Sequence, residues 1–98
     1  LNLSNNQLTG ILPDNLGNQD SLQTINLGFN YLEGEIPITI LQNDNLELLY
    51  LHVNNLHGII SEAVCERENP IKLLVYGNSF CPPYPECIRY IGKQICKD

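Results

Sequence analysis

Residues 1–18 read LNLSNNQLTGILPDNLGN, and residues 25–42 read INLGFNYLEGEIPITILQ. The two stretches carry the same kinds of residue at the same positions, so that residue 25 corresponds to residue 1. Shifting the rest of the chain by the same period of 24 brings further matches into register without an insertion. A fixed period of this length is typical of a solenoid, in which each repeat forms one turn and stacks on its neighbours.

Three kinds of position recur in every full repeat. Paired apolar residues come first, an asparagine follows three residues later, and a glycine comes four residues after the asparagine. Three full repeats span residues 1–24, 25–48 and 49–72, and a partial fourth spans 73–80. The recurring positions are the pairs Leu1/Leu3, Ile25/Leu27, Leu49/Leu51 and Leu73/Val75, then Asn6, Asn30, Asn54 and Asn78, and then Gly10, Gly34 and Gly58.

Each recurring position has a physical reason. The alternating apolar pairs have the period of two that predicts a short strand with one buried face, and stacked repeats place such strands in a parallel sheet. The asparagines follow the strands at a turn, where their amides can satisfy backbone groups that would otherwise be buried without partners. The four are therefore predicted to form a ladder. The glycines permit backbone angles that a side chain disfavours.

The stretch of residues 1–18 resembles the plant-type extracellular leucine-rich repeat, L-x-L-x-x-N-x-L-x-G-x-I-P-x-x-L-G-x. The resemblance covers residues 1–80 and implies an α/β solenoid with a parallel β-sheet on its concave face. It is specific for the fold and weak for the function, because the framework positions are not the ones that touch ligands. Proteins of this type include receptor ectodomains and secreted inhibitors.

The third repeat and the tail depart from the pattern. Ser61 replaces a proline and Pro70 replaces a leucine, which predicts that the convex side is rerouted there. Residues 81–98 abandon the repeat and resemble the cysteine-bearing C-terminal caps of secreted leucine-rich-repeat proteins. Within this cap, the spacing of Cys87, Ile88, Ile91 and Ile95 predicts a short helix over the end of the core, although Gly92 weakens it.

Four cysteines in so small a region indicate two disulfides formed in an oxidising compartment, each worth roughly 2–4 kcal/mol. Three pairings are possible. We favour Cys65 with Cys81, which would tie the last repeat to the cap, and Cys87 with Cys96, which would close the cap itself. The protein is thus expected to be secreted or displayed at the cell surface.

Composition excludes several partners. The formal net charge of −6 disfavours nucleic acid and anionic lipid, and no apolar run is long enough to insert in a membrane.

Leu1 and Leu3 start inside a repeat, so we expect earlier repeats or a neighbouring chain to cover that N-terminal edge. The sequon Asn2-Leu3-Ser4 is a candidate glycosylation site, which would make the protein a glycoprotein.

No enzyme, metal or cofactor site is expected. The spacing of the cysteines lacks a close C-x-x-C pair, and the two histidines, His52 and His57, are expected at the surface of another repeat. The carboxylates of Glu33 and Glu35 fall in a turn with nothing to build a pocket around them. A disulfide-bonded cysteine also supplies no thiolate for catalysis.

Function in such a fold is expected from the variable strand positions on the concave face. Toward the C-terminus these change from small polar residues to an exposed aromatic and apolar group. We expect this group to bind a protein, peptide or polysaccharide partner; the alternative is that the chain is a structural component of an extracellular filament, sheath or surface assembly. The candidate ligand-binding residues are Phe29, Tyr50, His52, Val53, Leu74 and Tyr76.

Overall fold

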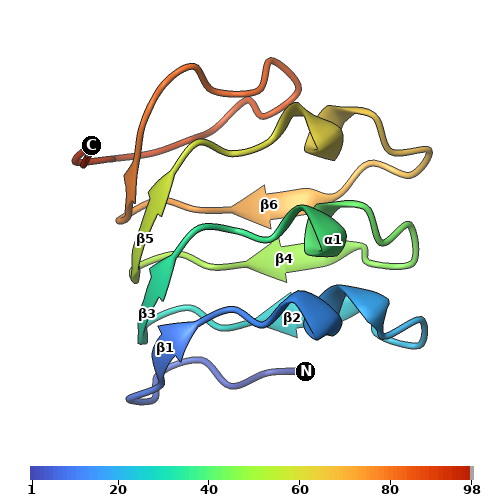
Figure 1. The fold of residues 1–98 in the computed structure, drawn as a ribbon, viewed down its shortest axis with the longest axis horizontal. Coiled ribbons are helices and arrows are strands. Elements are labelled where there is room, and N and C mark those ends of the chain that lie inside the picture. The colour runs from blue at the N-terminus through green and yellow to red at the C-terminus, as the bar shows by residue number, and fades with distance from the viewer. Residues whose placement is uncertain (98) are drawn as a thin grey trace.

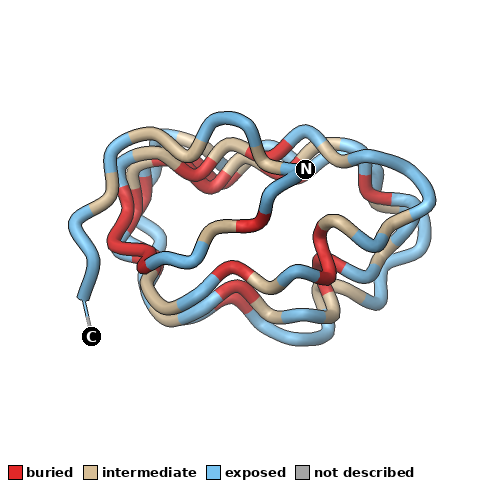
Figure 2. The backbone as a smooth tube through the Cα atoms, turned by 90° about the horizontal axis from the view of Figure 1, so that it is seen from above, coloured by how far each residue is buried: buried red, intermediate tan, exposed pale blue. Residues whose placement is uncertain are grey.

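The computed structural model describes residues 1–97, so Asp98, the last residue of the predicted cap, lies outside the described residues. The chain winds as a solenoid whose strands recur once in every turn, at the predicted period. Viewed from above, each turn is an elongated ring, and the buried segments line its inside (Figure 2). One turn contributes a strand to each of two sheets and a helical turn to the opposite side (Figure 1).

The paired apolar residues form the first sheet, which confirms the predicted parallel arrangement. Ile25, Leu49 and Leu73 lie in register in its three strands and point into the core. Asn2 extends the sheet by one bridge to Asn26. The strands, in their order across the sheet, are β2 (Thr24–Asn26), β4 (Leu48–Tyr50) and β6 (Lys72–Leu74).

A second parallel sheet, which the sequence did not lead us to expect, lies beyond the asparagine turns. Here the extended backbone between the asparagine and the glycine of each repeat pairs with the same segment of the next repeat. The glycines within these strands have positive φ angles, +88° at Gly10, +85° at Gly34 and +90° at Gly58, as predicted. The strands are β1 (Thr9–Ile11), β3 (Tyr31–Gly34), β5 (Asn55–Gly58) and β7 (Ser79–Phe80).

The convex side carries one helical turn in each repeat, and these turns pack on one another. The predicted rerouting of the third repeat is wrong at this point, because its helical turn lies at the equivalent position. Ser61 occupies the N-cap position that Pro13 and Pro37 hold in the first two repeats, and its hydroxyl accepts a hydrogen bond from the Ala63 N–H at 3.1 Å. The three elements are η1 (Asp14–Asn18), α1 (Ile38–Leu41) and η2 (Glu62–Cys65).

The asparagines of successive repeats form a hydrogen-bonded ladder along the turn. Asn54 is representative, since its amide donates to the carbonyls of Leu27, Leu51 and His52 at 3.0–3.3 Å, and its Oδ1 accepts from the Leu32 N–H at 3.0 Å. Asn30 and Asn78 are buried and bonded in the same way, whereas Asn6 is exposed and donates only to the carbonyls of Leu3 and Ser4.

Gln94 of the cap adds a further rung to the ladder. Its Oε1 accepts from the Phe80 N–H at 3.0 Å, and its Nε2 donates to the Val75 carbonyl at 2.8 Å. Phe80 and Val75 occupy the same columns of the repeat as Leu32 and Leu27. The Leu32 N–H and the Leu27 carbonyl are the groups that bond to Asn54. A residue outside the repeat therefore satisfies the backbone groups that the next asparagine of the series would satisfy.

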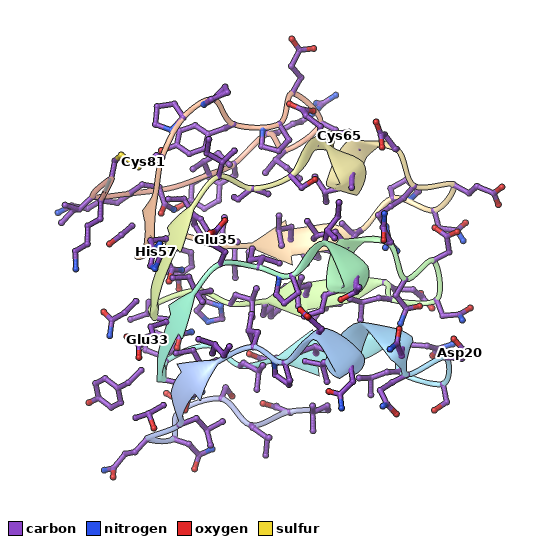
Figure 3. The ribbon with its side chains drawn as sticks, viewed as in Figure 1. Asp20, Glu33, Glu35, His57, Cys65 and Cys81 are labelled. Carbon is purple, nitrogen blue, oxygen red and sulfur yellow. A yellow bond between two sulfur atoms is a disulfide. The ribbon has the colours of Figure 1, made fainter. Side chains whose placement is uncertain are left out.

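The expected disulfide pairing is wrong. Cys65 is bonded to Cys87, and Cys81 is bonded to Cys96. The physical reason is the shape of the turn: Cys65 lies on the convex side, at the far end of the turn from Cys81, which follows the last strand of the second sheet (Figure 3). The first bond still ties the last full repeat to the cap, and the second closes the cap.

The tail is extended, so the predicted helix over Cys87–Ile95 is also wrong. The Gly77 N–H donates to the Lys93 carbonyl at 2.9 Å, and the Ile95 N–H donates to the Asn78 carbonyl at 3.1 Å. The tail thus pairs with the open edge of the last repeat, and Gly92, with a φ of +73°, lies where a helix would have continued. Ile88 and Ile91 still pack against the core.

Candidate binding surface

The outer face of the first sheet displays the variable positions. Each strand directs one outward side chain from its last residue, Asn26, Tyr50 or Leu74, and the residue two positions beyond lies on the same face. These further positions are Gly28, His52 and Tyr76. Stacking therefore brings side chains from neighbouring turns of the solenoid into contact.

His52 is the centre of a ring cluster on this face. Its imidazole lies 5.2 Å from the ring of Phe29 and 5.8 Å from that of Tyr50, both edge-on, and it stacks on Tyr76 with centroids 5.1 Å apart. Tyr90 of the cap continues the cluster, with its ring centroid 6.4 Å from that of Tyr76. We call Phe29, Tyr50, His52, Tyr76 and Tyr90 the aromatic patch.

His52 itself is buried, which corrects the expectation of a surface histidine. Its side chain covers Gly28, where a Cβ atom would meet the imidazole Cε1 at 2.3 Å. Only 8% of the residue is exposed, Nδ1 has no hydrogen-bond partner in the described chain, and burial lowers its pKa below the ordinary value of 6.5. A neutral imidazole is the form that such an apolar setting favours.

The other patch residues are accessible. Phe29 is 44% exposed and Tyr90 60%, and Tyr50 and Tyr76 are half-buried. A cation lies at the edge of the patch, since Lys72 Nζ is 5.8 Å from the centroid of the Tyr50 ring, within the range of a cation–π interaction.

The two remaining candidates, Val53 and Leu74, are half-buried beside the patch. Leu74 pairs with Tyr50 in the sheet, and Val53 lies in the turn that follows His52. Val53 has a φ of +55° and Phe29 one of +56°, values in the left-handed region that non-glycine residues seldom adopt. All six candidate residues therefore lie on or beside one surface, and Tyr90 is the member that the sequence did not indicate, because it comes from outside the repeats.

Asn2, the candidate glycosylation site, is exposed at the opposite end of the same face. Its Oδ1 accepts hydrogen bonds from the backbone N–H of Ser4 at 3.1 Å and from the Ser4 hydroxyl at 2.7 Å. Glycosylation there stays a prediction.

Metal-binding clusters and membrane-spanning helices are both absent from the described chain. Within residues 1–97, no group of three or more His, Cys, Asp and Glu side chains could hold a metal ion. Over the same residues, no helix combines the length and the apolar character needed to cross a membrane.

Comparisons with known proteins agree with the fold. The family model described as Leucine Rich Repeat matches residues 1–19 and 21–43. A chain of the crystal structure of PEPR1–AtPEP1 is 33% identical with a TM-score of 0.81, and it aligns with 89% of this chain. A chain of the BIR3–SERK2 complex from Arabidopsis thaliana is 26% identical with a TM-score of 0.82 over 98% of this chain.

A third similar structure is the plant peptide hormone receptor RGFR1 in complex with RGF2, at 32% identity and a TM-score of 0.76 over 81% of this chain. The chain spans only 12% and 13% of the PEPR1–AtPEP1 and RGFR1 chains, and 53% of the chain of the BIR3–SERK2 complex. A search of curated protein sequences gave no significant match.

Proposed function

We propose that this chain, a plant-type leucine-rich-repeat protein with a disulfide-bonded cap, is an extracellular recognition module that binds a protein, peptide or carbohydrate partner through the aromatic patch. We take residues 1–80 as the repeats and residues 81–98 as the cap. The observation that carries the proposal is the patch itself. Four accessible aromatic rings, displayed by the first sheet, its turn and the cap, can bury a large apolar area at small entropic cost.

The comparisons support recognition as the class of function. One of the similar structures is a plant peptide hormone receptor in complex with RGF2. Two disulfides support an oxidising, extracellular location. An enzyme is not proposed, since the patch offers no nucleophile, acid or base in an open pocket; His52, its one titratable group near neutral pH, is buried.

Backbone strain within the surface also supports the proposal. Phe29 and Val53 hold left-handed backbone angles at a cost of about 1–3 kcal/mol each. Strain of this size persists where the surrounding structure enforces it, and it clusters at functional sites.

The test is a selection of binders on the immobilised chain from displayed random peptides and from an oligosaccharide array. Tyr50→Ala and Tyr76→Ala should each weaken the selected binders tenfold or more, the loss typical of a central aromatic residue in an interface. Tyr31→Ala is the matched control, because Tyr31 is 57% exposed, lies on β3 of the second sheet, and takes no part in the ring contacts of the patch. Urea unfolding of all three variants verifies that they fold.

Binding that is equally sensitive to Tyr31→Ala, or insensitive to the two patch variants, would overturn the proposal. Concentration-dependent assembly into filaments, measured by sedimentation and abolished by the patch variants, would instead assign the surface to self-association. That outcome would favour the alternative of a structural component.

A further inference from the structure

Charge is segregated along the solenoid. Residues 1–71 carry nine acidic side chains and one basic one, whereas residues 72–97 carry four basic side chains and one acidic one. The last strand of the first sheet and the cap are therefore positive on a protein whose formal net charge is −6. The aromatic patch reaches this positive end, since Tyr76 follows β6 and Tyr90 belongs to the cap.

A groove of about 400 Å³ opens between the tail and the last turns of the solenoid. Its walls include Asn55 and Ser79 from the turns and Lys93, Ile95 and Lys97 from the tail. We call it the cap groove. No acidic side chain is among the described residues that line it.

The pairing of the tail determines which side chains face the groove. Side chains alternate along an extended segment, and Gln94 and Cys96 turn inward, to the ladder and to the bond with Cys81. Lys93, Ile95 and Lys97 are the intervening residues and are exposed. The backbone bonds that hold Lys93 and Lys97 to Gly77 and Ser79 thereby present two lysines and one isoleucine on a rigid edge.

The cap groove adjoins the aromatic patch. Gly77, one of its lining residues, directly follows Tyr76, and the tail runs so close to the patch that a Cβ atom at Gly92 would lie 2.3 Å from Tyr76 Cβ. Tyr90 and Lys93 are three residues apart on that same segment. One ligand can therefore occupy both sites.

We infer that the cap groove binds the side-chain carboxylates of an acidic polypeptide segment whose apolar residues lie on the aromatic patch. This inference rests on the proposed function and names the partner class. Lysine ammonium groups are suited to carboxylates as compact point charges, and residues 1–71, with nine acidic side chains and one basic one, would repel an acidic segment.

A polypeptide fits this surface better than an acidic polysaccharide. Leu74, Val53 and the faces of the aromatic rings surround the centre of the patch with apolar atoms. Sugar hydroxyl groups buried there would lose their hydrogen bonds to water without replacement, whereas apolar side chains would lose none.

The test uses peptides selected from a random displayed library on the wild-type chain, resynthesised with fluorescein and measured by anisotropy. Selected sequences should be enriched in Asp and Glu beside aromatic or aliphatic residues. Replacing their acids by Gln or Asn should weaken binding roughly three- to tenfold at low salt, with a smaller effect at high salt. The variants Lys93→Gln and Lys97→Gln should each reduce that difference and together remove it, whereas Arg89→Gln, the same change of charge as either single variant on an exposed cap residue outside the groove, should preserve it.

The outcomes separate this inference from the proposed function. Peptides that depend on Tyr50 and Tyr76 but bind equally with acids or amides would refute the inference and leave the function standing. Polygalacturonate oligosaccharides that bind through both lysines, while no peptide does, would refute the polypeptide assignment alone. If nothing is retained above the level of the Tyr50→Ala/Tyr76→Ala chain, both proposals fail.

Discussion

Asn54→Ala is the substitution that tests the hydrogen-bonded ladder most directly. The Asn54 side chain makes four hydrogen bonds at 3.0–3.3 Å in a buried turn, three as donor and one as acceptor. Its three acceptor carbonyls each keep a second partner when the amide is removed. The Leu27 carbonyl still accepts from Asn30, that of Leu51 from Asn78, and that of His52 from the Phe29 N–H.

Asn54→Ala removes the acceptor of the Leu32 N–H, because the Asn54 Oδ1 is the side-chain partner of this N–H. Leu32 is only 5% exposed, so water does not readily replace that partner. An orphaned buried donor costs about 1–3 kcal/mol, and the three shared bonds contribute roughly 0.5 kcal/mol each at the low end of the usual range. We therefore expect Asn54→Ala to lower the free energy of unfolding by about 3 kcal/mol. Asn54→Asp should cost at least as much, since it places a carboxylate against three carbonyl oxygens.

Urea unfolding followed by circular dichroism, with the disulfides intact, measures the effect. Asn6→Ala is the matched control, because Asn6 is exposed and makes only two bonds, at 2.9 and 3.1 Å; it should cost less than about 1 kcal/mol. If the two alanine variants unfold at the same urea concentration, the ladder does not stabilise the turn.

Substitutions at three further positions test the surface and the convex side. Gly28→Ala should displace the His52 imidazole and weaken binding of selected peptides, measured by anisotropy, since its methyl carbon would lie 2.3 Å from Cε1. Burial lowers the pKa of His52 from 6.5, so on acidification the unfolded chain binds a proton before the folded chain does. The stability present above about pH 6.5 is therefore lost as the pH falls through the folded-state pKa. His52→Gln should make the free energy of unfolding less dependent on pH, measured by urea titrations at several pH values. The Arg67 guanidinium donates to the carbonyls of Leu41 and Asn43 at 2.9 and 2.6 Å and also to that of Leu46. Arg67→Met should therefore lower the thermal midpoint of unfolding by several degrees. Arg67→Lys should lower it by less, because an ammonium group can replace only part of this set of hydrogen bonds.

The repeated framework was predictable because each of its positions obeys a local rule that every turn repeats. Ile25, Leu49 and Leu73 share one buried column, and Gly34 and Gly58 share one left-handed conformation. The second sheet was missed for a different reason. Its strands are short and their pairing needs no alternation of apolar and polar residues, so the residue types do not predict the second sheet.

The structure of the cap could not be predicted correctly, because the cap occurs once and no second copy shows which of its positions recur. The spacing of Ile88, Ile91 and Ile95 fits a helix, yet the unpaired backbone groups of Gly77 and Asn78 at the open sheet edge recruit the tail as an extended partner. Gln94 could not be recognised as a ladder residue either, because its side chain reaches the last rung from a segment that lacks the period.

The candidate surface was predictable in position and not in detail. Strand alternation places Tyr50 and Tyr76 outward, but the burial of His52 depends on the missing side chain of Gly28, one repeat earlier. Tyr90 joins the patch through the fold of the cap. A column of residue types indicates which face a side chain occupies, whereas its exposure depends on its neighbours in the adjacent turns.

The turn after each strand separates what the framework requires from what the surface requires. Asn5, Phe29 and Val53 have φ angles of 55–58°, and Gly77 continues the column at +73°. Asparagine and glycine adopt this conformation readily, but phenylalanine and a β-branched valine do so only under strain. A framework selected for stability alone would carry asparagine or glycine at all four positions. The two exceptions flank His52, and the ring of Phe29 contacts it edge-on. The residue types that oppose the backbone thus lie in the aromatic patch or directly beside it, which is where a recognition function would require them.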